Sequence, residues 1–232
     1  MPTLPLWRPA AITIVGLGPG DLRDLTLGAW QALSMATHIV LRTERHPCVP
    51  ALASHFQLES CDLFYERHDQ FQDVYAAIVQ RVVGLATEVG GVVYAVPGHP
   101  WVGEATTALI LAQAEAAGLD VRIVGGISFV ETVLAAVGVD GMDGLQVADA
   151  MLLARQNHPK VEPGQPLLIG QLYAEWLASD LKLTLMNAYP DEHQVILVQA
   201  AGTDDATVHR LPLYELDRGD HFDHLTSLFV PP

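Results

Sequence analysis

The residues best suited to chemistry in this sequence lie in short polar segments. One group is Arg42, Arg45 and His46, directly after an apolar run, and a second is Arg67 and His68 further along. Guanidinium and imidazole groups bind carboxylates through charge-assisted hydrogen bonds. The two groups therefore indicate a binding site for an anionic small molecule, and ordinary surface side chains are the alternative interpretation.

Three further segments place glycine with proline or serine where a buried strand is expected to end: Gly16–Asp21, Pro97–Pro100 and Gly125–Ser128. In open α/β sheets, ligands bind beyond the carboxyl ends of the strands. Glycine lets a ligand approach the main chain, whose N–H and C=O groups can then bind it directly. A structural turn is the alternative for any one of these loops taken alone.

The first loop is not a dinucleotide-binding fingerprint, although it begins like one. The pattern G-x-G-x-x-G requires a third glycine where this chain has Asp21, and Pro19 lacks the N–H group that a pyrophosphate would need.

Alternating strand and helix patterns must position these segments. Apolar runs predict strands over residues 12–15, 37–43, 92–96 and 120–124, and helical periodicity predicts helices over 25–36, 67–90, 103–119 and 129–139. Thr26 is expected to cap the first helix, and Asp69 with Gln72 fits a capping box for the second. This alternation favours an α/β fold with a mainly parallel sheet.

The pattern changes from about residue 145 onwards. We predict a strand over 166–171, a helix over 174–190, a strand over 193–203 and a strand or edge segment over 206–216. The chain is therefore expected to have an N-terminal α/β domain of residues 1–126 and a C-terminal α/β domain of residues 127–232. The final segment SLFVPP is interpreted as the beginning of a linker.

Composition excludes several classes of protein. The formal net charge is −15 and there is no basic run, so nucleic acid is not expected as a partner. No apolar run reaches the ~18 residues of a membrane span. Cys48 and Cys61 stand in no CxxC motif, so we expect free thiols and a cytoplasmic protein. His221 and His224 lack a third ligand at a convincing spacing, so no metal is expected.

The three loops together resemble the tetrapyrrole methylase family of S-adenosylmethionine-dependent methyltransferases. VGLGPGDLRDLTLGAWQALSMATHIVL is similar to that family's first-strand motif, and VPGHP stands where the family has a Gly-Asp-Pro loop. GGIS stands where the family has Pro-Gly-Ile-Ser/Thr, and AAGT stands near a late loop that closes on the adenosine. The resemblance covers nearly the whole chain.

This resemblance implies two α/β domains with S-adenosylmethionine in a cleft between them, held largely by backbone groups. The residues that it places at the cofactor are Pro19, Pro97, Gly98, His99, Val102, Ser128, Phe129, Gln171, Leu172 and Gly202. It also implies a tetrapyrrole or related small molecule as the methyl acceptor, with Arg42, Arg45 and His46 binding it. Tyr65, Arg67, His68 and His99 are the candidates for catalysis, since a base is needed if the acceptor carries a proton.

Two positions depart from the family pattern. His99 stands where the second loop of the family has aspartate, and Arg42 corresponds to an aspartate after the second strand in many relatives. Both departures remove a carboxylate near the acceptor. They therefore argue against the usual tetrapyrrole substrate of the family, but not against S-adenosylmethionine as the cofactor.

The segments YERHDQFQDVY, YAVPGHP, ASDLKLTLMNAYPDEHQV and LPLYELDR are similar to the N-terminal methylase-like domain of bacterial fusions with a MazG-type nucleoside triphosphate pyrophosphohydrolase. The Glu-x-x-Glu helix of such a hydrolase is absent, so that activity is not expected of this chain. One alternative function is then a regulatory module that binds S-adenosylmethionine. Another is a peptide N-methyltransferase, on the weaker parallel of Tyr65, Arg67 and Phe71. Relatives imply a homodimer.

Overall fold

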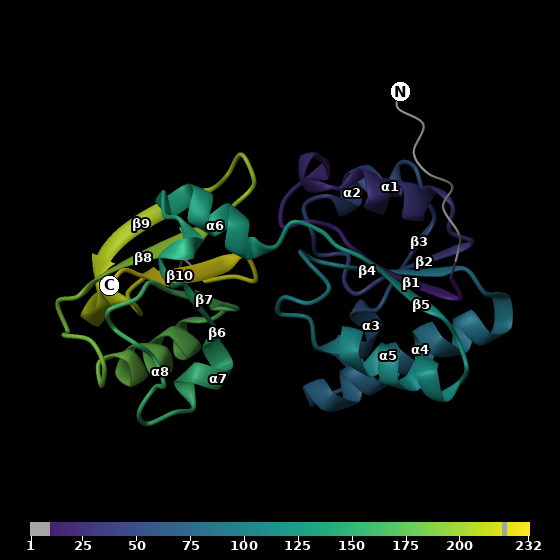
Figure 1. Cartoon of the computed structure of the whole chain (residues 1–232). Coiled ribbons are helices and arrows are strands. Elements are labelled where there is room, and N and C mark those ends of the chain that lie inside the picture. Colours follow the sequence, from purple (N-terminus) through teal and green to yellow (C-terminus); the bar gives the residue numbers. More distant parts are fainter. Residues whose placement is uncertain (1–9, 220–221) are drawn as a thin grey trace. The chain divides into compact units, whose positions relative to one another are not determined.

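The computed structural model describes residues 10–219 and 222–232. The chain divides into two compact units after Ser128, and Figure 1 shows that each unit has its own β-sheet with helices packed on it. The two units are described separately.

The sheet of the first unit is entirely parallel. Its strands are β1 (Ile12–Gly16), β2 (His38–Leu41), β3 (Leu58–Ser60), β4 (Val92–Val96) and β5 (Val121–Val124), in the order β3-β2-β4-β1-β5. The central strands β1 and β4 are buried along their whole length, which explains their continuous apolar sequence. Because all five strands run the same way, their carboxyl ends lie along one edge of the sheet.

Helices cover both faces of this sheet (Figure 1). One face carries α1 (Leu27–Ser34) and α2 (Val49–Ala53), whose buried residues pack with the inward side chains of β1, β2 and β4. The other carries α4 (Phe71–Val89) and α5 (Ala105–Ala116), with the short α3 (Asp62–Arg67) beside α4. A 3-10 turn, η1 (Leu22–Asp24), follows the first loop.

The helix ends agree in part with the sequence patterns. Thr26 caps α1 as predicted, its Oγ1 accepting the N–H of Ala29 at 3.1 Å. The predicted capping box at Asp69 is wrong: α4 begins only at Phe71, and its N-cap Gln70 makes no side-chain capping bond. The reason is that α3 ends first, and the extended backbone of His68 separates the two helices.

The sheet of the second unit is mixed. Its strands are β6 (Gln146–Asp149), β7 (Leu167–Gly170), β8 (Gln194–Gln199), β9 (Thr207–Pro212) and β10 (Thr226–Val230), in the order β6-β7-β10-β8-β9. Helix α6 (Phe129–Val137) packs on one face, and α7 (Ala150–Ala154) and α8 (Glu175–Leu185) pack on the other. The short turns η2 (Gly141–Asp143) and η3 (Leu213–Glu215) complete the unit. The mainly parallel sheet predicted from the N-terminal alternation is therefore confirmed for the first unit, and the second unit has the mixed sheet of an α+β arrangement.

Strand β10 overturns the interpretation of SLFVPP as a linker. It is buried along its length and lies in the middle of the sheet, antiparallel to both β7 and β8. Five residues before two prolines are too few to show a period, and the partners that make this segment a strand come from distant parts of the sequence.

Candidate functional site

The three glycine-containing loops of the first unit meet at the carboxyl ends of β1, β4 and β5. Gly18 and Gly98 pair with each other: the N–H of Gly98 donates to the Gly18 oxygen at 2.8 Å, and the N–H of Gly18 donates to the Gly98 oxygen at 3.2 Å. The N–H of Leu17 donates to the Val96 oxygen at 2.9 Å. The first and second loops therefore form one hydrogen-bonded platform.

Glycine is required where this platform packs against the third loop. A Cβ on Gly16 would lie 2.5 Å from the Gly98 oxygen and 2.6 Å from the Gly126 nitrogen, and a Cβ on Gly126 would also collide with the Gly98 oxygen. Gly98 differs from both. Its φ of +63° favours glycine, but the nearest atom to a Cβ there would be the Ile127 oxygen at 4.0 Å. The side of Gly98 away from the packed loops is therefore open to the close approach of a ligand.

The main chain of Gly98 is not itself unpaired, because both of its polar groups already bond to Gly18. Its carbonyl oxygen keeps a second lone pair. What Gly98 offers a ligand is chiefly the absence of a side chain. Val102 and Pro19, the other residues expected here, are half-buried and buried respectively, and the Val102 N–H donates to the His99 oxygen at 2.9 Å.

His99 is oriented by its own loop. The N–H of Trp101 donates to Nδ1 of His99 at 3.1 Å, so in the neutral ring the proton sits on Nε2. Nε2 would lie 2.9 Å from a Cβ on Gly125, so the glycine there makes room for the imidazole. In this arrangement His99 offers a hydrogen-bond donor and has no free nitrogen to act as a base.

Arg42 lies at the end of β2 within a largely buried polar cluster. Its Nη1 is 3.1 Å from Oε2 of Glu104, whose side chain is 2% exposed, and its guanidinium lies 5.8 Å from the centre of the Tyr75 ring. The other oxygen of Glu104 accepts from the N–H (2.9 Å) and the hydroxyl (2.5 Å) of Thr106, which in turn bonds Tyr94. Burial is the largest single effect and opposes the charge on Arg42, but Glu104 together with the phenols of Tyr65, Tyr94 and Tyr75 outweighs it and raises the pKa of the guanidinium above its usual value.

Among the four catalytic candidates, Tyr65 joins this cluster. Burial raises the pKa of the Tyr65 phenol, and the nearby Arg42 partly offsets that rise. The phenol is thus protonated at neutral pH and is a hydrogen-bond donor, not a ready base. Arg67 and His68 are exposed, and since residues two apart do not share a helix face, Arg67 does not accompany Tyr65.

His46 supports the first loop from within the protein, which we call its bracing role. Its side chain is buried, with Nε2 2.9 Å from the Gly18 oxygen and Nδ1 3.1 Å from Sγ of Cys48. The expected binding of substrate by His46 does not fit this geometry, because Nε2 is engaged by the Gly18 oxygen of the first loop and Nδ1 by Cys48. Arg45, its predicted companion, is exposed. Burial raises the pKa of Cys48 and Cys61 to about 12, and both are free thiols, as predicted.

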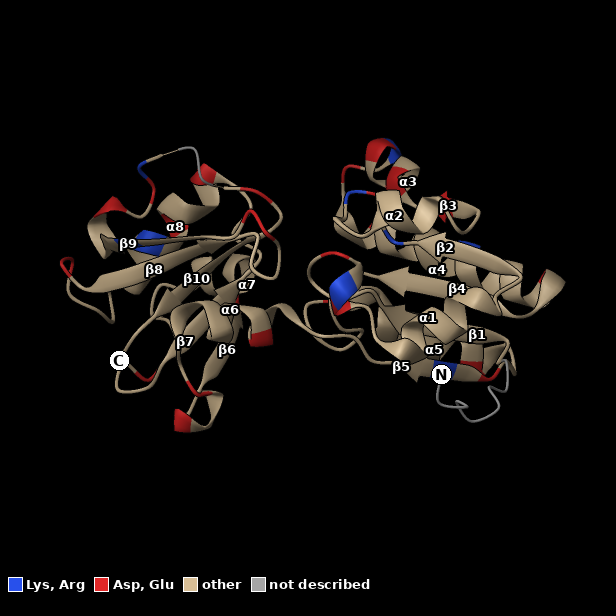
Figure 2. Ribbon diagram, turned by 90° about the horizontal axis from the view of Figure 1, so that it is seen from above, with Lys and Arg blue, Asp and Glu red and all other residues tan. Residues whose placement is uncertain are grey.

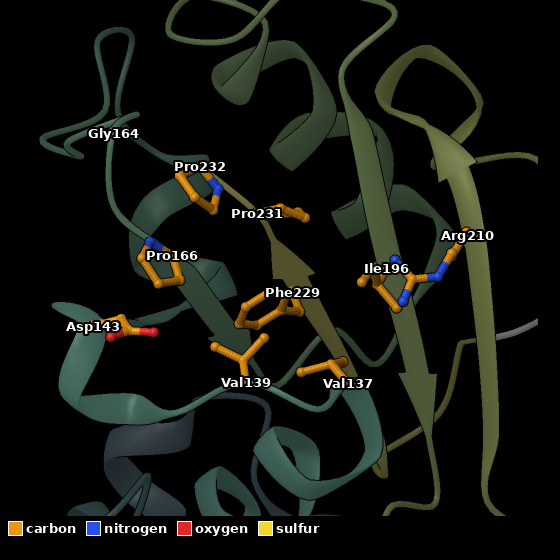
Figure 3. A pocket seen from close by; sticks show the side chains of 10 residues that line it. All are labelled: Val137, Val139, Asp143, Gly164, Pro166, Ile196, Arg210, Phe229, Pro231 and Pro232. Atoms are coloured by element: carbon orange, nitrogen blue, oxygen red, sulfur yellow. The ribbon is translucent and has the colours of Figure 1, made fainter.

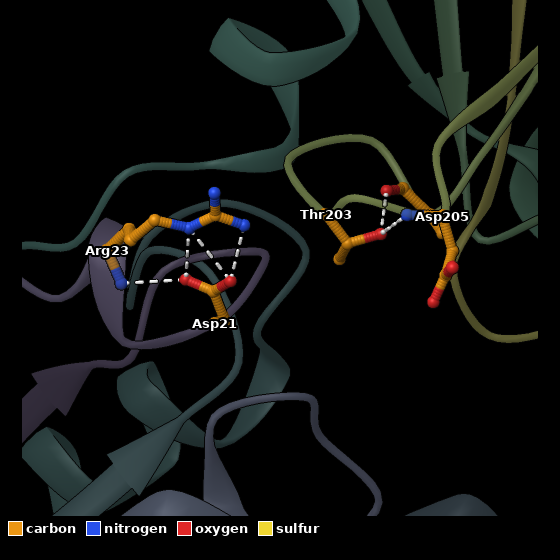
Figure 4. Close-up of polar contacts among 5 residues, drawn as sticks. Asp21, Arg23, Thr203 and Asp205 are labelled. Carbon is orange, nitrogen blue, oxygen red and sulfur yellow. Dashed lines mark hydrogen bonds and ion pairs between the residues drawn. The ribbon is translucent and has the colours of Figure 1, made fainter.

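Asp21 explains why the first loop departs from the dinucleotide pattern. Its carboxylate accepts the N–H of Arg23 at 2.8 Å and pairs with the Arg23 guanidinium at 2.7 Å, so it caps η1 (Figure 4). A glycine at this position would remove that cap.

In the second unit, the carboxyl ends of β7 and β8 carry backbone strain. Gln171 has φ +62° and Ala200 has φ +52°, values that residues other than glycine rarely adopt. Leu225 and Thr226, at the start of β10, hold both turns: the N–H of Leu172 donates to the Thr226 oxygen, and that of Ala200 to the Leu225 oxygen. Such strained positions cluster at ligand sites.

Of the remaining predicted cofactor residues, Phe129 and Gly202 lie in the second unit beside these turns, and Ser128 is the last residue of the first unit. Phe129 packs its ring on Gly170, where a Cβ would come within 2.7 Å of the ring, and Ser128 is buried. Gly202, with φ +91°, belongs to the turn after β8 that Thr203 closes by donating to the Ala200 oxygen. Figure 4 also shows Thr203 accepting the N–H of Asp205 at 3.2 Å.

A hollow of about 390 Å³ in the second unit is a different feature (Figure 3). Val137, Val139 and Phe229 form its apolar wall. Pro166 precedes β7 and Pro231 follows β10, so the hollow lies at the edge of the sheet opposite to Gln171 and Ala200. None of the predicted site residues lines it.

Other classes of site find no support in residues 10–219 and 222–232. Within these residues no group of three or more His, Cys, Asp or Glu side chains could hold a metal ion, and no helix could cross a membrane. His221, which entered the metal interpretation with His224, falls outside the described residues.

Comparison with known proteins decides the family. Residues 11–217 match the family model of tetrapyrrole (corrin/porphyrin) methylases. The chain belongs to the tetrapyrrole methylase family. The fold class and the resemblance inferred from the sequence are thereby confirmed, and S-adenosylmethionine is the methyl donor of this family.

Solved structures show the same fold. A uroporphyrin-III-C-methyltransferase from Thermus thermophilus matches with a TM-score of 0.73 and 23% identity, over 95% of this chain and 91% of that one. The methyltransferase CobJ matches with a TM-score of 0.70 and 18% identity, over 95% and 93% of the two chains. A diphthine synthase matches with a TM-score of 0.69 and 19% identity, over 95% and 89%.

A curated relative is closer in sequence and much longer. The uncharacterized protein YabN of Bacillus subtilis is 38% identical over 222 residues, which are 95% of this chain and 45% of YabN. The chain thus spans about half the length of this relative.

Several members of the candidate site could not be found from sequence patterns. Glu104, Tyr75, Tyr94 and Thr106 were not predicted. The one available signal was the acidic Glu104 directly before a helix, since a side chain there caps the helix by accepting a backbone N–H. That signal predicts the bond to Thr106 but not the pairing with Arg42, which comes from another strand.

Proposed function

We propose that this chain is a methyltransferase that takes its methyl group from S-adenosylmethionine and transfers it to a tetrapyrrole or a related flat small molecule. The observation that carries the proposal is the loop platform at the end of the first sheet. Its glycines pack at distances that exclude a Cβ, while Gly98 leaves one side open. Such a platform suits a ligand that is held against the main chain.

The residues present fit the donor. Pro97, Gly98, His99 and Val102 of the first unit would hold it. When bound, the donor supplies a methyl group attached to a positively charged sulfur, and the sulfur keeps both electrons of the bond that breaks. The chain's residues then have to align the acceptor with that methyl group and keep it in place.

Two side chains suit that positioning role. The Nε2–H of His99 and the phenol of Tyr65 are hydrogen-bond donors in the structure, so they would orient an oxygen atom of the acceptor. Neither is arranged to remove a proton. A proton lost from the acceptor would therefore pass to water or to a base on the acceptor itself.

The test has two steps. Calorimetric titration of the chain with S-adenosylmethionine should show one binding site. Incubation with the reduced tetrapyrrole uroporphyrinogen III, whose pyrrole carbons are nucleophilic, should then yield S-adenosylhomocysteine and a methylated tetrapyrrole, and omission of the tetrapyrrole should abolish both products. Failure to bind S-adenosylmethionine would refute the whole proposal, whereas binding with no methylated product would refute uroporphyrinogen III as the acceptor.

A regulatory role is the second candidate, and the length of YabN favours it. Because the relative continues over more than half of its length beyond the matched part, donor binding could serve another activity of a longer protein. Binding without S-adenosylhomocysteine formation, for any acceptor tried, would favour this role. Added methyl masses on the purified chain would instead favour peptide methylation.

We also propose that the chain forms a homodimer, which light scattering at micromolar concentration would test.

A further inference from the structure

The hollow in the second unit has the size and the lining of a small-molecule pocket (Figure 3). Its most deeply buried members are Ile196 of β8 and Phe229 of β10, and the half-buried Val137 and Val139 lie beside them. An engineered cavity of about 150 Å³ holds benzene, so a hollow of about 390 Å³ has room for one substituted ring. Pockets that bind small molecules have mainly apolar walls and a few polar groups.

Arg210 brings a positive charge to this apolar hollow. Phe229, Ile196 and Arg210 are cross-strand partners in the register of β10, β8 and β9, so their side chains stand in one row on the same face of the sheet. This is the face that α6 covers. Figure 3 shows the Arg210 side chain reaching from β9 towards Ile196. The guanidinium therefore lies at the end of an apolar row.

The guanidinium of Arg210 has no counter-charge among residues 10–219 and 222–232. No ion pair or side-chain hydrogen bond joins it to any of these residues. Its neighbours on the same face of the sheet are uncharged, since Ile196 stands across the strand pair and Val208 two residues before it. Acidic residues outnumber basic ones 27 to 12, and Figure 2 shows them spread over both units. An arginine without a carboxylate partner is therefore unusual in this chain.

Asp143 limits the charge that a ligand can carry. It lies in η2, on the side of the hollow away from Arg210 (Figure 3). Because Asp143 is exposed, it remains hydrated and needs no cation from a ligand, but it would repel a second anionic group. The charges on the rim therefore favour a molecule with a single anionic group, placed at Arg210.

From these observations we infer that the hollow is a second binding site, for a small apolar molecule that carries one carboxylate. The apolar body lies against Val137, Val139 and Phe229, and the carboxylate pairs with Arg210. The hollow lies at the edge of the second sheet opposite to Gln171 and Ala200, so this site is separate from the candidate ligand edge. The inference goes beyond the proposed methyl transfer and does not depend on it.

The test uses 3-phenylpropanoate as the probe, titrated into the isotopically labelled chain and followed by NMR. The probe should shift the methyl signals of Val137 and Val139 and the ring signals of Phe229. Acetate, which has the charge without the ring, should bind at least ~tenfold more weakly, or about 1.4 kcal/mol, because it buries little apolar surface. 3-Phenylpropanamide, which has the ring without the charge, should bind about threefold more weakly, because ion pairs at exposed arginines are weak.

Variants of two arginines test the role of the guanidinium. Arg210→Gln should remove the preference for 3-phenylpropanoate over its amide, and it should fold normally because the side chain is exposed. Arg210→Lys should retain the preference, since it keeps the charge. The matched control is Arg155→Gln, because Arg155 is also exposed and is the C-cap of α7, on the other face of the same sheet. It removes the same charge from the chain and should leave the preference unchanged.

Three results would overturn the site: no shift at Val137, Val139 and Phe229, equal binding of 3-phenylpropanoate and its amide, or a preference that survives in Arg210→Gln. Tighter binding of 3-phenylpropylamine than of 3-phenylpropanoate would overturn the anionic ligand and make Asp143 the anchor. Probe binding that weakens as the chain concentration rises would show that a second copy covers the hollow, and it would overturn the small-molecule site.

Discussion

Substituting Gly98 by alanine would separate its conformational role from its role at the ligand. Its φ of +63° lies in the left-handed region, so a Cβ costs about 1–2 kcal/mol. The space around that Cβ is otherwise open, with the Ile127 oxygen 4.0 Å away, so no further steric cost is expected. The pairing with Gly18 uses only main-chain atoms and should persist.

Gly118 provides the control. It has φ +68°, no atom lies within 4 Å of where its Cβ would be, and it follows α5, at the end of that helix away from the loop platform. Gly118→Ala should therefore lose the same 1–2 kcal/mol of unfolding free energy as Gly98→Ala, because the backbone penalty is the same. Urea denaturation of both variants would measure it.

Only Gly98→Ala should also weaken S-adenosylmethionine binding, by at least ~tenfold, which corresponds to about 1.4 kcal/mol. The reason is that the added methyl group enters the space that the proposal assigns to the donor. Calorimetric titration of the wild type and both variants gives the comparison. If Gly98→Ala bound the donor as tightly as the wild type, the placement of the donor at this loop would be wrong, whatever the stability data showed.

Three further outcomes follow from the contacts. Glu104→Gln should lower the unfolding free energy by roughly 3 kcal/mol, because it leaves Arg42 buried without its counter-charge, and pairing it with Arg42→Gln should recover part of that loss in urea denaturation. His46→Ala should cost about 0.5–1.5 kcal/mol in the same measurement, since the Gly18 oxygen loses one of its two hydrogen-bond partners and keeps the N–H of Gly98; a loss below half a kcal/mol would contradict the bracing role. Burial alone would raise the pKa of Asp217, but hydrogen bonds from Lys182 and Ser179 lower it below the value in the unfolded chain. At acid pH the unfolded chain therefore binds more protons than the folded chain. The stability that the ionised Asp217 contributes is lost as the pH falls through its folded-state pKa. Lys182→Met should flatten the acid part of the stability profile, and an unchanged slope would refute the assignment.

The sequence was informative wherever the determining interactions are local. Buried runs such as Ile12–Val15 and the glycine-proline loops after them predicted the first sheet and the loops at its carboxyl edge, because a strand that ends in glycine is visible within a few residues. The cap on α1 at Thr26 was predictable for the same reason.

Features that depend on distant partners could not be predicted in this way. The pairing of Arg42 with Glu104 joins the end of β2 to the start of α5, and nothing near either residue announces the other. Strand β10 is five residues whose identity as a central strand comes from β7 and β8 on either side of it. His46 looked like a substrate ligand by its charge and its neighbours, and burial against Gly18 gave it another role.

The candidate ligand edges of the two units are built by different physical means. In the first unit, glycine at positions 16 and 126 removes side chains so that three loops can pack closely, and glycine at 98 adopts its left-handed turn without a steric penalty. In the second unit, Gln171 and Ala200 adopt left-handed backbone without being glycine, at a cost of about 1–2 kcal/mol each. That cost is sustained because hydrogen bonds to the residues at the start of β10 hold both turns. The strand that was mistaken for a linker is therefore what fixes the strained turns, so the second unit needs β10 for its candidate ligand edge as much as for its fold.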